Sequence, residues 1–373
     1  MHLKDGHEIV VDARWLRTGI GRYILTLLQE LKPRLSGATL TGITAPEHVK
    51  TIEPYCDRVL RVSCDIYTVR EQFSLPRIAR HASVFCSPHY NTPLLRRGSL
   101  VVTVHDLTHL LFDAYKTRIT SRLYAAPMLR MACARATRIV TPSNYTKQMM
   151  VEHLNADPDK ISVIPASVDS VFQPQDRESA AEIVRLSYGI SGPYILCVTA
   201  TVPHKNLRRL LMAHQQLCNQ NRDTPTLVLV LREDPASSTM DEQMRSLITR
   251  PQVRCLSGIP DASLASLYAG ALMTVMPSLE EGFGLPVVES MACGTPVACA
   301  HAASLPEVAG DAAIFFAPDS VDDMSSALIR LTHSTELRRQ LSARGLKRAA
   351  MYSTSRAGEA YASMLSTVIR AQS

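Results

Sequence analysis

Two glutamates lie eight positions apart in the segment of this sequence that most directly indicates chemistry. Residues 277–297 read PSLEEGFGLPVVESMACGTPV, with Glu281 before a Gly-Phe-Gly turn and Glu289 after it. Two glutamates at this spacing are common on the solvated face of any helix and mean little alone. Their context here is a glycine turn that leads into an apolar, helix-like run, which favours a binding site over a solvated helix face.

The apolar run after the turn predicts a helix with its N-terminus at a ligand. Proline favours the first turn of a helix and glycine favours the position after its last turn, so Pro286 and Gly294 place the helix start near Leu285. The unpaired N–H groups and positive dipole end would face a ligand above residues 282–284, where phosphate is the natural occupant. Carboxylates beside a phosphate site fit if they bind ribose and hexose hydroxyl groups. The segment therefore predicts a site for a nucleotide diphosphate sugar.

The same segment resembles the signature of the retaining glycosyltransferases of family 4, which have the GT-B fold. The signature reads E-G-F-G-L-P-x-x-E-x-M-A-x-G-x-P-V, and this sequence matches it at Glu281, Gly282, Phe283, Gly284, Leu285, Pro286, Glu289, Met291, Ala292, Gly294, Pro296 and Val297. The resemblance implies that Glu289 binds the ribose and that Glu281 binds hydroxyl groups of the donor sugar. It also implies that the donor lies against Gly282, Phe283, Gly284 and Leu285.

A second glycine turn follows the first predicted strand. Gly19 and Gly21 allow a close approach of the backbone to a bound group, although a plain tight turn is the equal alternative. The turn lacks the third glycine and the downstream acid of a dinucleotide-binding fingerprint. In the resembled family this loop covers the donor diphosphate. The string D-x-R-x-L-x-x-G-I-G-R-Y, present from Asp12 to Tyr23, is similar to that of transferases with mannose-like donors and favours GDP-mannose or a related GDP-deoxyhexose.

Two further side chains at strand ends are candidates for catalysis together with Glu281. His105 ends the predicted strand before Asp106, where it either binds the transferred sugar, as the resemblance implies, or caps a loop. Lys205 lies at a strand-to-helix junction, where the compact ammonium group is well placed to bind a diphosphate. The alternative is that Lys205 is an ordinary surface lysine. The family pattern G-x-x-x-P-x-K-N is matched only in part, because Thr199 replaces the glycine and His204 stands where arginine is frequent.

The resemblance implies a mechanism without a metal or a cofactor. Lys205, the backbone near Leu285 and the glycine loop would stabilise the charge on the departing diphosphate. The acceptor proton would pass to the departing phosphate oxygen on the same face of the sugar. Since no D-x-D pair stands at a suitable strand end, the sequence predicts no metal site.

The elements that position these residues indicate an α/β protein with two doubly wound, Rossmann-like domains facing a central cleft, which is the GT-B fold. The length of 373 residues favours two domains, and short β-rich runs alternate with helix-length segments. We expect an acceptor-side domain at 1–180, a donor domain at 181–350 and a helix at 351–373 that crosses back. The expected strands cover 8–13, 83–86, 100–105, 137–141, 161–165, 194–198, 227–231, 253–256, 271–276 and 295–300.

Composition restricts the setting. The chain carries a net charge of +6 and nine cysteines without metal-like spacing, which we interpret as reduced thiols of a cytoplasmic protein. We see no signal peptide and no membrane-spanning run.

The acid-free interval 114–151 contains the basic residues Lys116, Arg118, Arg122, Arg130, Arg135, Arg138 and Lys147, which indicate either peripheral contact with the inner face of an anionic membrane or an ordinary solvated helix. Nucleic-acid binding is not expected, because aromatic residues are scarce and no such motif occurs.

We therefore expect a retaining glycosyltransferase that moves a hexose, with mannose from GDP-mannose favoured, to a glycan or polyprenyl-diphosphate-linked acceptor in O-antigen or exopolysaccharide biosynthesis. A donor such as UDP-glucose or UDP-N-acetylglucosamine is the first alternative. A UDP-sugar 2-epimerase on the same fold and a catalytically inactive binding protein are further alternatives. The presence of Glu281, Glu289 and Lys205 argues against the inactive protein, because a binding scaffold does not require them.

Overall fold

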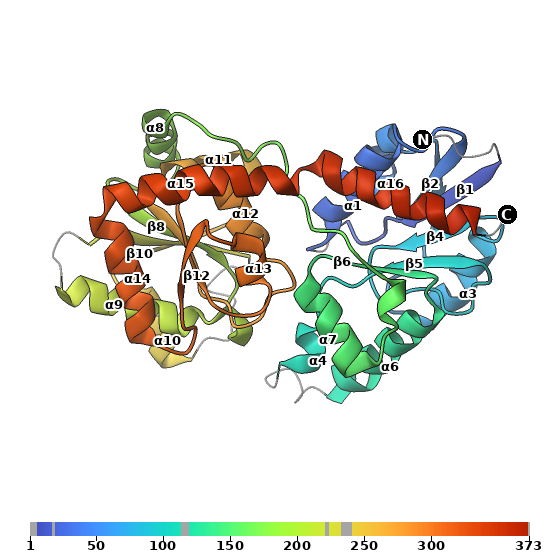
Figure 1. The fold of residues 1–373 in the computed structure, drawn as a ribbon, viewed down its shortest axis with the longest axis horizontal. Helices are drawn as coiled ribbons and strands as arrows, with labels where there is room; N and C mark the ends of the chain where they lie inside the picture. The colour runs from blue at the N-terminus through green and yellow to red at the C-terminus, as the bar shows by residue number, and fades with distance from the viewer. Residues whose placement is uncertain (1–5, 17–18, 113–118, 221–223, 233–240, 372–373) are drawn as a thin grey trace. The chain divides into compact units, whose positions relative to one another are not determined.

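The computed structural model describes residues 6–16, 19–112, 119–220, 224–232 and 241–371 (Figure 1). The chain forms two compact units: unit 1 contains residues 1–167 and 354–373, and unit 2 contains residues 168–353. The division lies at 167/168, whereas the sequence suggested a boundary near 180. The reason is α8 (Arg177–Tyr188), which packs on α11 (Asp261–Gly270) of unit 2 and therefore belongs with the residues that follow it.

Unit 1 is built on a seven-stranded parallel sheet. Its strands are β1 (His7–Asp12), β2 (Ala38–Thr44), β3 (Arg58–Arg61), β4 (Val84–Ser87), β5 (Ser99–Thr103), β6 (Arg138–Thr141) and β7 (Ile161–Val163). They lie in the order β3-β2-β1-β4-β5-β6-β7, so the sheet grows outwards in both directions from β1 and β4. This order is that of a Rossmann fold, and ligands of such folds bind at the carboxyl ends of the strands where the order reverses.

Helices cover both faces of the unit 1 sheet. They are α1 (Gly21–Leu31), α2 (Val49–Ile52), α3 (Val69–Ile78), α4 (Thr108–Leu111), α6 (Ile119–Arg135), α7 (Asn144–Leu154) and α16 (Thr354–Arg370), with 3₁₀ turns η1 (Pro46–His48), η2 (Glu53–Tyr55) and η3 (Pro158–Lys160). Successive side chains of a strand point to opposite faces. Accordingly, Ile9 and Val11 pack with α1 and α16, whereas Val10 packs with α3, α6 and α7. In Figure 1, α16 lies beside α1.

Unit 2 repeats the design with a six-stranded parallel sheet in the order β10-β9-β8-β11-β12-β13. The strands are β8 (Tyr194–Thr199), β9 (Thr226–Leu231), β10 (Val253–Ser257), β11 (Met273–Met276), β12 (Val297–Ala300) and β13 (Ala313–Phe316). The order reverses between β8 and β11, which are hydrogen-bonded neighbours. The side chains of Leu227, Val228, Leu229, Val230 and Leu231 are all buried, as expected for a parallel strand covered on both faces.

The helices of unit 2 pack on one another. Besides α8 and α11 they are α9 (Leu207–Gln220), α10 (Glu242–Ile248), α12 (Leu285–Ala292), α13 (Leu305–Ala309), α14 (Val321–His333) and α15 (Thr335–Ala349), with 3₁₀ turns η4 (Pro203–Lys205) and η6 (Ala350–Tyr352). Helix α9 contacts α10 and α14, while α12 contacts α11 and α15. The first and last residues of unit 2 lie side by side, because the Val168 N–H donates to the Tyr352 carbonyl over 2.9 Å.

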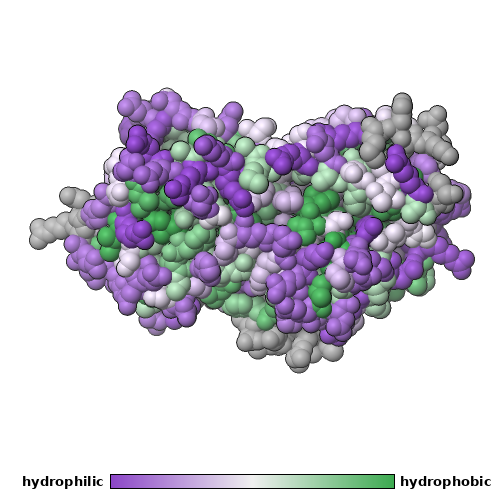
Figure 2. Space-filling model, viewed as in Figure 1, coloured by the Kyte–Doolittle hydropathy of each residue, from purple (hydrophilic) through white to green (hydrophobic). Residues whose placement is uncertain are grey.

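Figure 2 shows hydrophilic residues over most of the visible face, with scattered hydrophobic patches on both units. Among the residues that the structure describes, no helix combines the length and the apolar character needed to cross a bilayer.

Candidate active site

Lys205 and Glu281 are brought together by the topology of unit 2. Strand β8 leads into the loop that carries Lys205, and its neighbour β11 leads into the loop that carries Glu281. Because parallel neighbours end at the same edge of a sheet, these loops meet where the strand order reverses. The Lys205 Nζ lies 2.5 Å from Glu281 Oε1, and both side chains are partly exposed. An ammonium group has three N–H donors, so a lysine held by one carboxylate can also bind a phosphate.

Asn206 fixes the loop that carries Lys205, and the sequence analysis assigned it no role. Its backbone is left-handed, with φ of 56°, and its side chain is buried. The Asn206 Nδ2 donates to the carbonyl of Pro277 over 3.0 Å and to the carbonyl of Pro318 over 2.7 Å. The amide thereby ties the loop after β8 to the loop after β11. The signal in the sequence was the Pro-x-Lys-Asn string at a strand end, where asparagine tolerates the left-handed conformation.

Two arginines, Arg208 and Arg209, follow Lys205 at the start of α9. Arg209 Nη1 donates to Asn206 Oδ1 over 3.0 Å, which makes it a support for the loop. Arg208 pairs with Asp241 and donates to Gln243 Oε1 over 2.9 Å, in exposed positions. Both arginines are therefore engaged within unit 2.

The predicted helix begins at Leu285, as the positions of Pro286 and Gly294 indicated. Its N-cap, Gly284, has φ of 96°, a conformation that favours glycine, and contributes no side-chain cap. A Cβ on Gly284 would lie 2.6 Å from Leu305 Cδ2, so a larger residue would require the turn or the buried Leu305 side chain to shift. The first turn of the helix thus presents backbone N–H groups and the positive end of its dipole beside Lys205 and Glu281.

The turn before this helix is held from two sides. The Ser304 hydroxyl donates to the Glu281 carbonyl over 2.8 Å and is fully buried. Phe283 is buried, and its ring meets the edge of the Tyr352 ring at 5.3 Å. These contacts hold the backbone of Gly282, Phe283 and Gly284 in one conformation. A turn that binds a diphosphate through its N–H groups requires such a fixed backbone.

Glu289 lies in the second turn of α12 and is buried, with 4% of its surface exposed. The Tyr268 hydroxyl donates to Glu289 Oε2 over 3.0 Å. Burial, followed by the nearby Glu289 carboxylate, raises the pKa of Tyr268 well above its ordinary value, so the phenol remains a donor. Tyr268 was not recognised from the sequence, because it is 21 residues away on α11 and no spacing rule connects the two.

The glycine loop lies in unit 1, after β1. Gly21 is the first residue of α1, and a Cβ there would lie 2.1 Å from the Leu16 carbonyl oxygen. This close backbone contact requires glycine. Gly19 is exposed, while residues 17 and 18 of the predicted loop lie outside the described residues.

A buried ionic cluster anchors the start of the same loop. Arg14 donates to Asp12 through Nε over 2.9 Å and through Nη2 over 2.8 Å. The Arg14 Nη2 also meets Glu71 Oε2 over 2.8 Å, and Asn91 Nδ2 donates to Glu71 Oε1 over 2.8 Å. The cluster joins the ends of β1 and β4 to α3, where the order of the unit 1 sheet reverses.

His105 also lies in unit 1, beyond the end of β5. Its Nε2 is 2.9 Å from the Pro88 carbonyl, which can only accept, so Nε2 carries the proton and Nδ1 is an acceptor. Burial lowers the pKa of His105 and lowers the pKa of His89 to about 3, so both rings are neutral at pH 7. The Asp106 side chain accepts from the Thr108 N–H over 2.9 Å, which agrees with a loop-supporting role.

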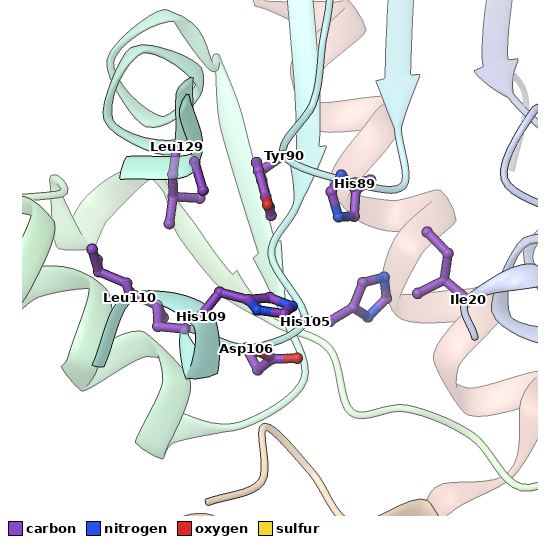
Figure 3. A pocket seen from close by; sticks show the side chains of 10 residues that line it. Ile20, His89, Tyr90, His105, Asp106, His109, Leu110 and Leu129 are labelled. Atoms are coloured by element: carbon purple, nitrogen blue, oxygen red, sulfur yellow. The ribbon is translucent and has the colours of Figure 1, made fainter. Parts of the chain in front are cut away.

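An open cavity lies beside His105 within unit 1. Its lining comprises Ile20, His89, Tyr90, His105, Asp106, Leu107, His109, Leu110, Ala125 and Leu129. Figure 3 shows His89, His105 and Ile20 on one side of the cavity and Leu110 and Leu129 on the other. Imidazole groups, one carboxylate and apolar walls suit an uncharged ring with hydroxyl groups.

The predicted site residues are therefore divided between the units. Lys205, Glu281 and the turn 282–285 meet in unit 2, with Glu289 four residues along the same helix, whereas His105, Gly19 and Gly21 belong to unit 1.

The basic interval 114–151 is described only in part. Lys116 and Arg118, and the side chain of Arg122, lie outside the described residues. Several of its other cations bind backbone carbonyls: Arg135 meets Leu94 and Arg96, Arg138 meets Asp159, and Lys147 meets Ile161. Arg130 is exposed.

Sequence comparisons match both halves of the chain. The model of glycosyl transferases group 1 matches residues 188–348, and that of glycosyltransferase family 4 matches residues 17–172. The O-antigen chain mannosyltransferase B of Escherichia coli is 30% identical over 277 residues, which is 73% of this chain and 70% of that protein. The O-antigen chain mannosyltransferase RfbU of Salmonella typhimurium is 28% identical, over 65% of this chain and 63% of that protein.

Solved structures agree on the fold. The sucrose-phosphate synthase of Thermosynechococcus elongatus has a TM-score of 0.75 at 18% identity and covers 98% of this chain and 99% of its own. The Anabaena protein HepE, solved with UDP-glucose, has a TM-score of 0.75 at 17% identity and covers 97% of this chain and all of its own. Together with the two Rossmann-like sheets and the sequence relatives, these similarities establish that the chain belongs to glycosyltransferase family 4 and has the GT-B fold.

Proposed function

We propose that this glycosyltransferase transfers mannose from GDP-mannose to a glycan or lipid-linked glycan acceptor during O-antigen or exopolysaccharide assembly, with retention of anomeric configuration. The sugar and the setting are supported by the mannosyltransferase relatives, of which the first is 30% identical over 73% of this chain. The string from Asp12 to Tyr23, typical of mannose-like donors, supports the same choice.

The observation that carries the proposal is the Lys205–Glu281 contact of 2.5 Å beside the N-terminus of α12. The lysine ammonium and the helix N-terminus provide positive potential for a diphosphate leaving group. The Glu281 carboxylate, while it contacts Lys205, can still accept hydrogen bonds from hydroxyl groups of the donor sugar. Glu289, held by Tyr268, binds the ribose hydroxyl groups.

In the proposed reaction, the bond between the anomeric carbon and the β-phosphate oxygen breaks while the acceptor oxygen bonds to the same face of that carbon. The acceptor proton passes to the departing phosphate oxygen, which gives the nucleoside diphosphate and the glycoside. Lys205 and the first turn of α12 stabilise the departing charge, and no step requires a metal. The neutral His105 accepts a hydrogen bond from a sugar hydroxyl through Nδ1.

The cavity beside His105 is proposed as the place of the acceptor sugar. The neutral His89 and His105 side chains and the Asp106 carboxylate line this cavity, so it favours an uncharged ring over a second diphosphate.

The test is thermal stabilisation by GDP, UDP, ADP and their common sugars, with a chelator present. A ligand that binds only the folded protein raises its melting temperature in proportion to the logarithm of its concentration. We expect a shift with GDP and GDP-mannose. A shift confined to UDP compounds would change the donor to UDP-glucose or UDP-N-acetylglucosamine, and no shift with any nucleotide would contradict a transferase function. Product analysis by nuclear magnetic resonance then checks the retained configuration.

A further inference from the structure

Four aromatic rings lie together beside the cavity of unit 1. Trp15 follows β1, Tyr67 precedes α3, and His89 and Tyr90 follow β4. The His89 ring stacks on Trp15, with centroids 4.1 Å apart, and lies against Tyr90, also at 4.1 Å. His89 and Tyr90 line the cavity, and Figure 3 shows both side chains at its wall. We call Trp15, Tyr67, His89 and Tyr90 the aromatic cluster.

Tyr67 is the exposed member of the aromatic cluster. Its ring centroid lies 5.2 Å from that of Trp15 and 6.0 Å from that of His89, and its plane is nearly perpendicular to both rings. Because the two distances are similar, the Tyr67 ring lies beside the Trp15–His89 stack and not at its end. Trp15 is 3% exposed, whereas Tyr67 is 47% exposed. The cluster therefore supports the Tyr67 ring from one side and leaves nearly half of the residue accessible to a ligand.

The backbone of Tyr67 has a conformation that is unfavourable for a bulky residue. Its φ is 63°, in the left-handed region, and the Thr68 hydroxyl donates to the Asp65 carbonyl over 2.8 Å across this turn. Such backbone strain is concentrated at functional sites. Burial raises the pKa of the Tyr67 phenol, and a hydrogen bond with Tyr90 opposes this shift. The phenol therefore keeps its proton at neutral pH, and the ring presents an uncharged surface.

We propose that Tyr67 binds the second sugar of the acceptor glycan, counted from the sugar in the cavity beside His105. An aromatic ring contacts the C–H face of a pyranose, while the hydroxyl groups at the edge of the sugar remain free to bind water or polar side chains. This inference deepens the proposed function and rests on it, because the first sugar is placed by that proposal.

His89 connects the Tyr67 platform with the cavity. The His89 Nδ1 accepts from the Asn91 N–H over 3.1 Å, so Nε2 carries the proton and is a hydrogen-bond donor. Burial lowers the pKa of His89 to about 3, and the ring is neutral at pH 7. None of the four rings of the aromatic cluster then carries a positive charge, which a bound phosphate would require. Their stacking surfaces and neutral polar atoms favour a chain of uncharged sugars.

The second sugar site gives the enzyme a place in a reaction sequence. Only an acceptor that already contains a glycosidic bond can fill the cavity and the Tyr67 platform together. An earlier glycosyl transfer must therefore supply the acceptor. The enzyme extends a glycan of at least two sugars and does not attach the first sugar to a carrier.

The test is saturation-transfer nuclear magnetic resonance on the full chain with GDP present. The probes are the methyl glycosides of mannose, galactose, glucose and N-acetylglucosamine, together with disaccharides built from these sugars. We expect at least one disaccharide to bind roughly tenfold more tightly than either of its monosaccharides. Saturation should reach the C–H protons of both of its sugars.

Three variants assign this gain to the Tyr67 ring. Tyr67→Asn removes the ring, and asparagine tolerates the left-handed backbone, so the variant remains folded. Tyr67→Phe keeps the ring without its hydroxyl group. Phe73→Ala removes a ring of α3 that is 54% exposed and is the matched control. We expect Tyr67→Asn alone to lose the tenfold advantage of the disaccharide, and chemical denaturation to show this variant at least as stable as the unmodified chain.

Four results would overturn the inference. The first is equal binding of monosaccharides and disaccharides by the unmodified chain, and the second is an undiminished disaccharide advantage in Tyr67→Asn. The third is loss of that advantage in Tyr67→Phe, which would assign the effect to the hydroxyl group. The fourth is weaker GDP binding by Tyr67→Asn, which would assign the ring to the nucleobase.

Thermal stabilisation by GDP, measured on the same preparations, separates this inference from the proposed function. A protein that GDP stabilises but that gains no affinity from a second sugar refutes only the Tyr67 site. A protein that no nucleotide stabilises contradicts the transferase function itself.

Discussion

Tyr268 donates a hydrogen bond of 3.0 Å to Glu289, and both side chains are buried. A buried carboxylate without donors is costly, so the phenol stabilises the ionised form of Glu289 in a defined orientation. The ribose-binding role proposed for Glu289 thus depends on a residue of a different helix.

Tyr268→Phe is expected to weaken GDP binding at least tenfold. The substitution removes one hydrogen bond to a charged group, which contributes about 1.5–3 kcal/mol, while it keeps the ring. Isothermal titration with GDP measures the effect. Tyr194→Phe is the matched control, because the buried Tyr194 hydroxyl donates to the Leu267 carbonyl over 2.7 Å and does not contact Glu289. Equal GDP affinity in the two variants would exclude a positioning role for Tyr268.

Lys205→Ala is expected to lower turnover by about 10²–10³, the usual loss when a donor to a developing oxyanion is removed. The variant also leaves Glu281 without the cation that it contacts at 2.5 Å. Turnover is followed as release of the nucleoside diphosphate. Lys347→Ala, at an exposed lysine of the same unit, controls for the loss of a charge. Normal turnover in Lys205→Ala would remove this lysine from the site.

Gly284→Ala is expected to reduce GDP affinity, whereas Gly294→Ala is expected to reduce only stability. Both glycines have positive φ, at 96° and 77°, so each substitution carries backbone strain of about 1 kcal/mol or more. Only at Gly284 does the new Cβ also clash, at 2.6 Å from Leu305 Cδ2, so the first turn of α12 and the buried Leu305 side chain must move apart. Chemical denaturation and GDP titration of both variants separate strain from displacement. Equal affinities would mean that this turn does not touch the donor.

His214 is expected to make unit 2 less stable in mild acid. Burial lowers the pKa of His214 to about 4, and Arg250 acts in the same direction. In the unfolded chain its pKa is about 6.5, so below that pH the unfolded state binds the extra proton. The free energy of unfolding therefore falls by up to about 1.4 kcal/mol per pH unit between about 6.5 and 4, and this contribution is unchanged above pH 6.5.

His214→Gln tests this pH dependence. The Gln side chain can donate to the Pro225 carbonyl and accept from Arg250, as the neutral imidazole does at 2.9 Å and 3.2 Å. Denaturation of both proteins across this pH range gives the difference in unfolding free energy. A difference that stays constant from pH 7 to pH 4 would show that folding does not lower the pKa of His214.

Most of the central strands could be predicted, because buried parallel strands form continuous apolar runs. The run 227–231 forms β9 with Thr226 added at its start, and the run 194–198 forms β8 with Thr199 added at its end. Strands β2 and β3 were missed. Strand β2 is interrupted by Gly42 and rich in threonine, and β3 is four residues with an arginine at each end. Strand β13, AIFF, is too short for its pattern to differ from that of a helix.

The candidate site could be predicted where its residues are close in the sequence. The signature placed Glu281, Glu289 and the start of α12, because proline and glycine mark helix ends by local sterics. The contacts of Asn206 with Pro277 and Pro318 and of Tyr268 with Glu289 could not be predicted. They join residues from different loops and helices, and only the order of the strands brings them together.

The discontinuity of unit 1 has a consequence for its synthesis. Helix α16 packs on α1 and supplies Tyr361, Leu365 and Ile369 to a core that otherwise consists of residues far earlier in the chain. Unit 2 is a single continuous segment whose two ends are joined by the Val168–Tyr352 hydrogen bond. On the ribosome, unit 2 can complete its fold as soon as Ser353 has emerged, whereas unit 1 must wait with one face of its sheet covered by α1 but not yet by α16. The N-terminal half is therefore the last to mature.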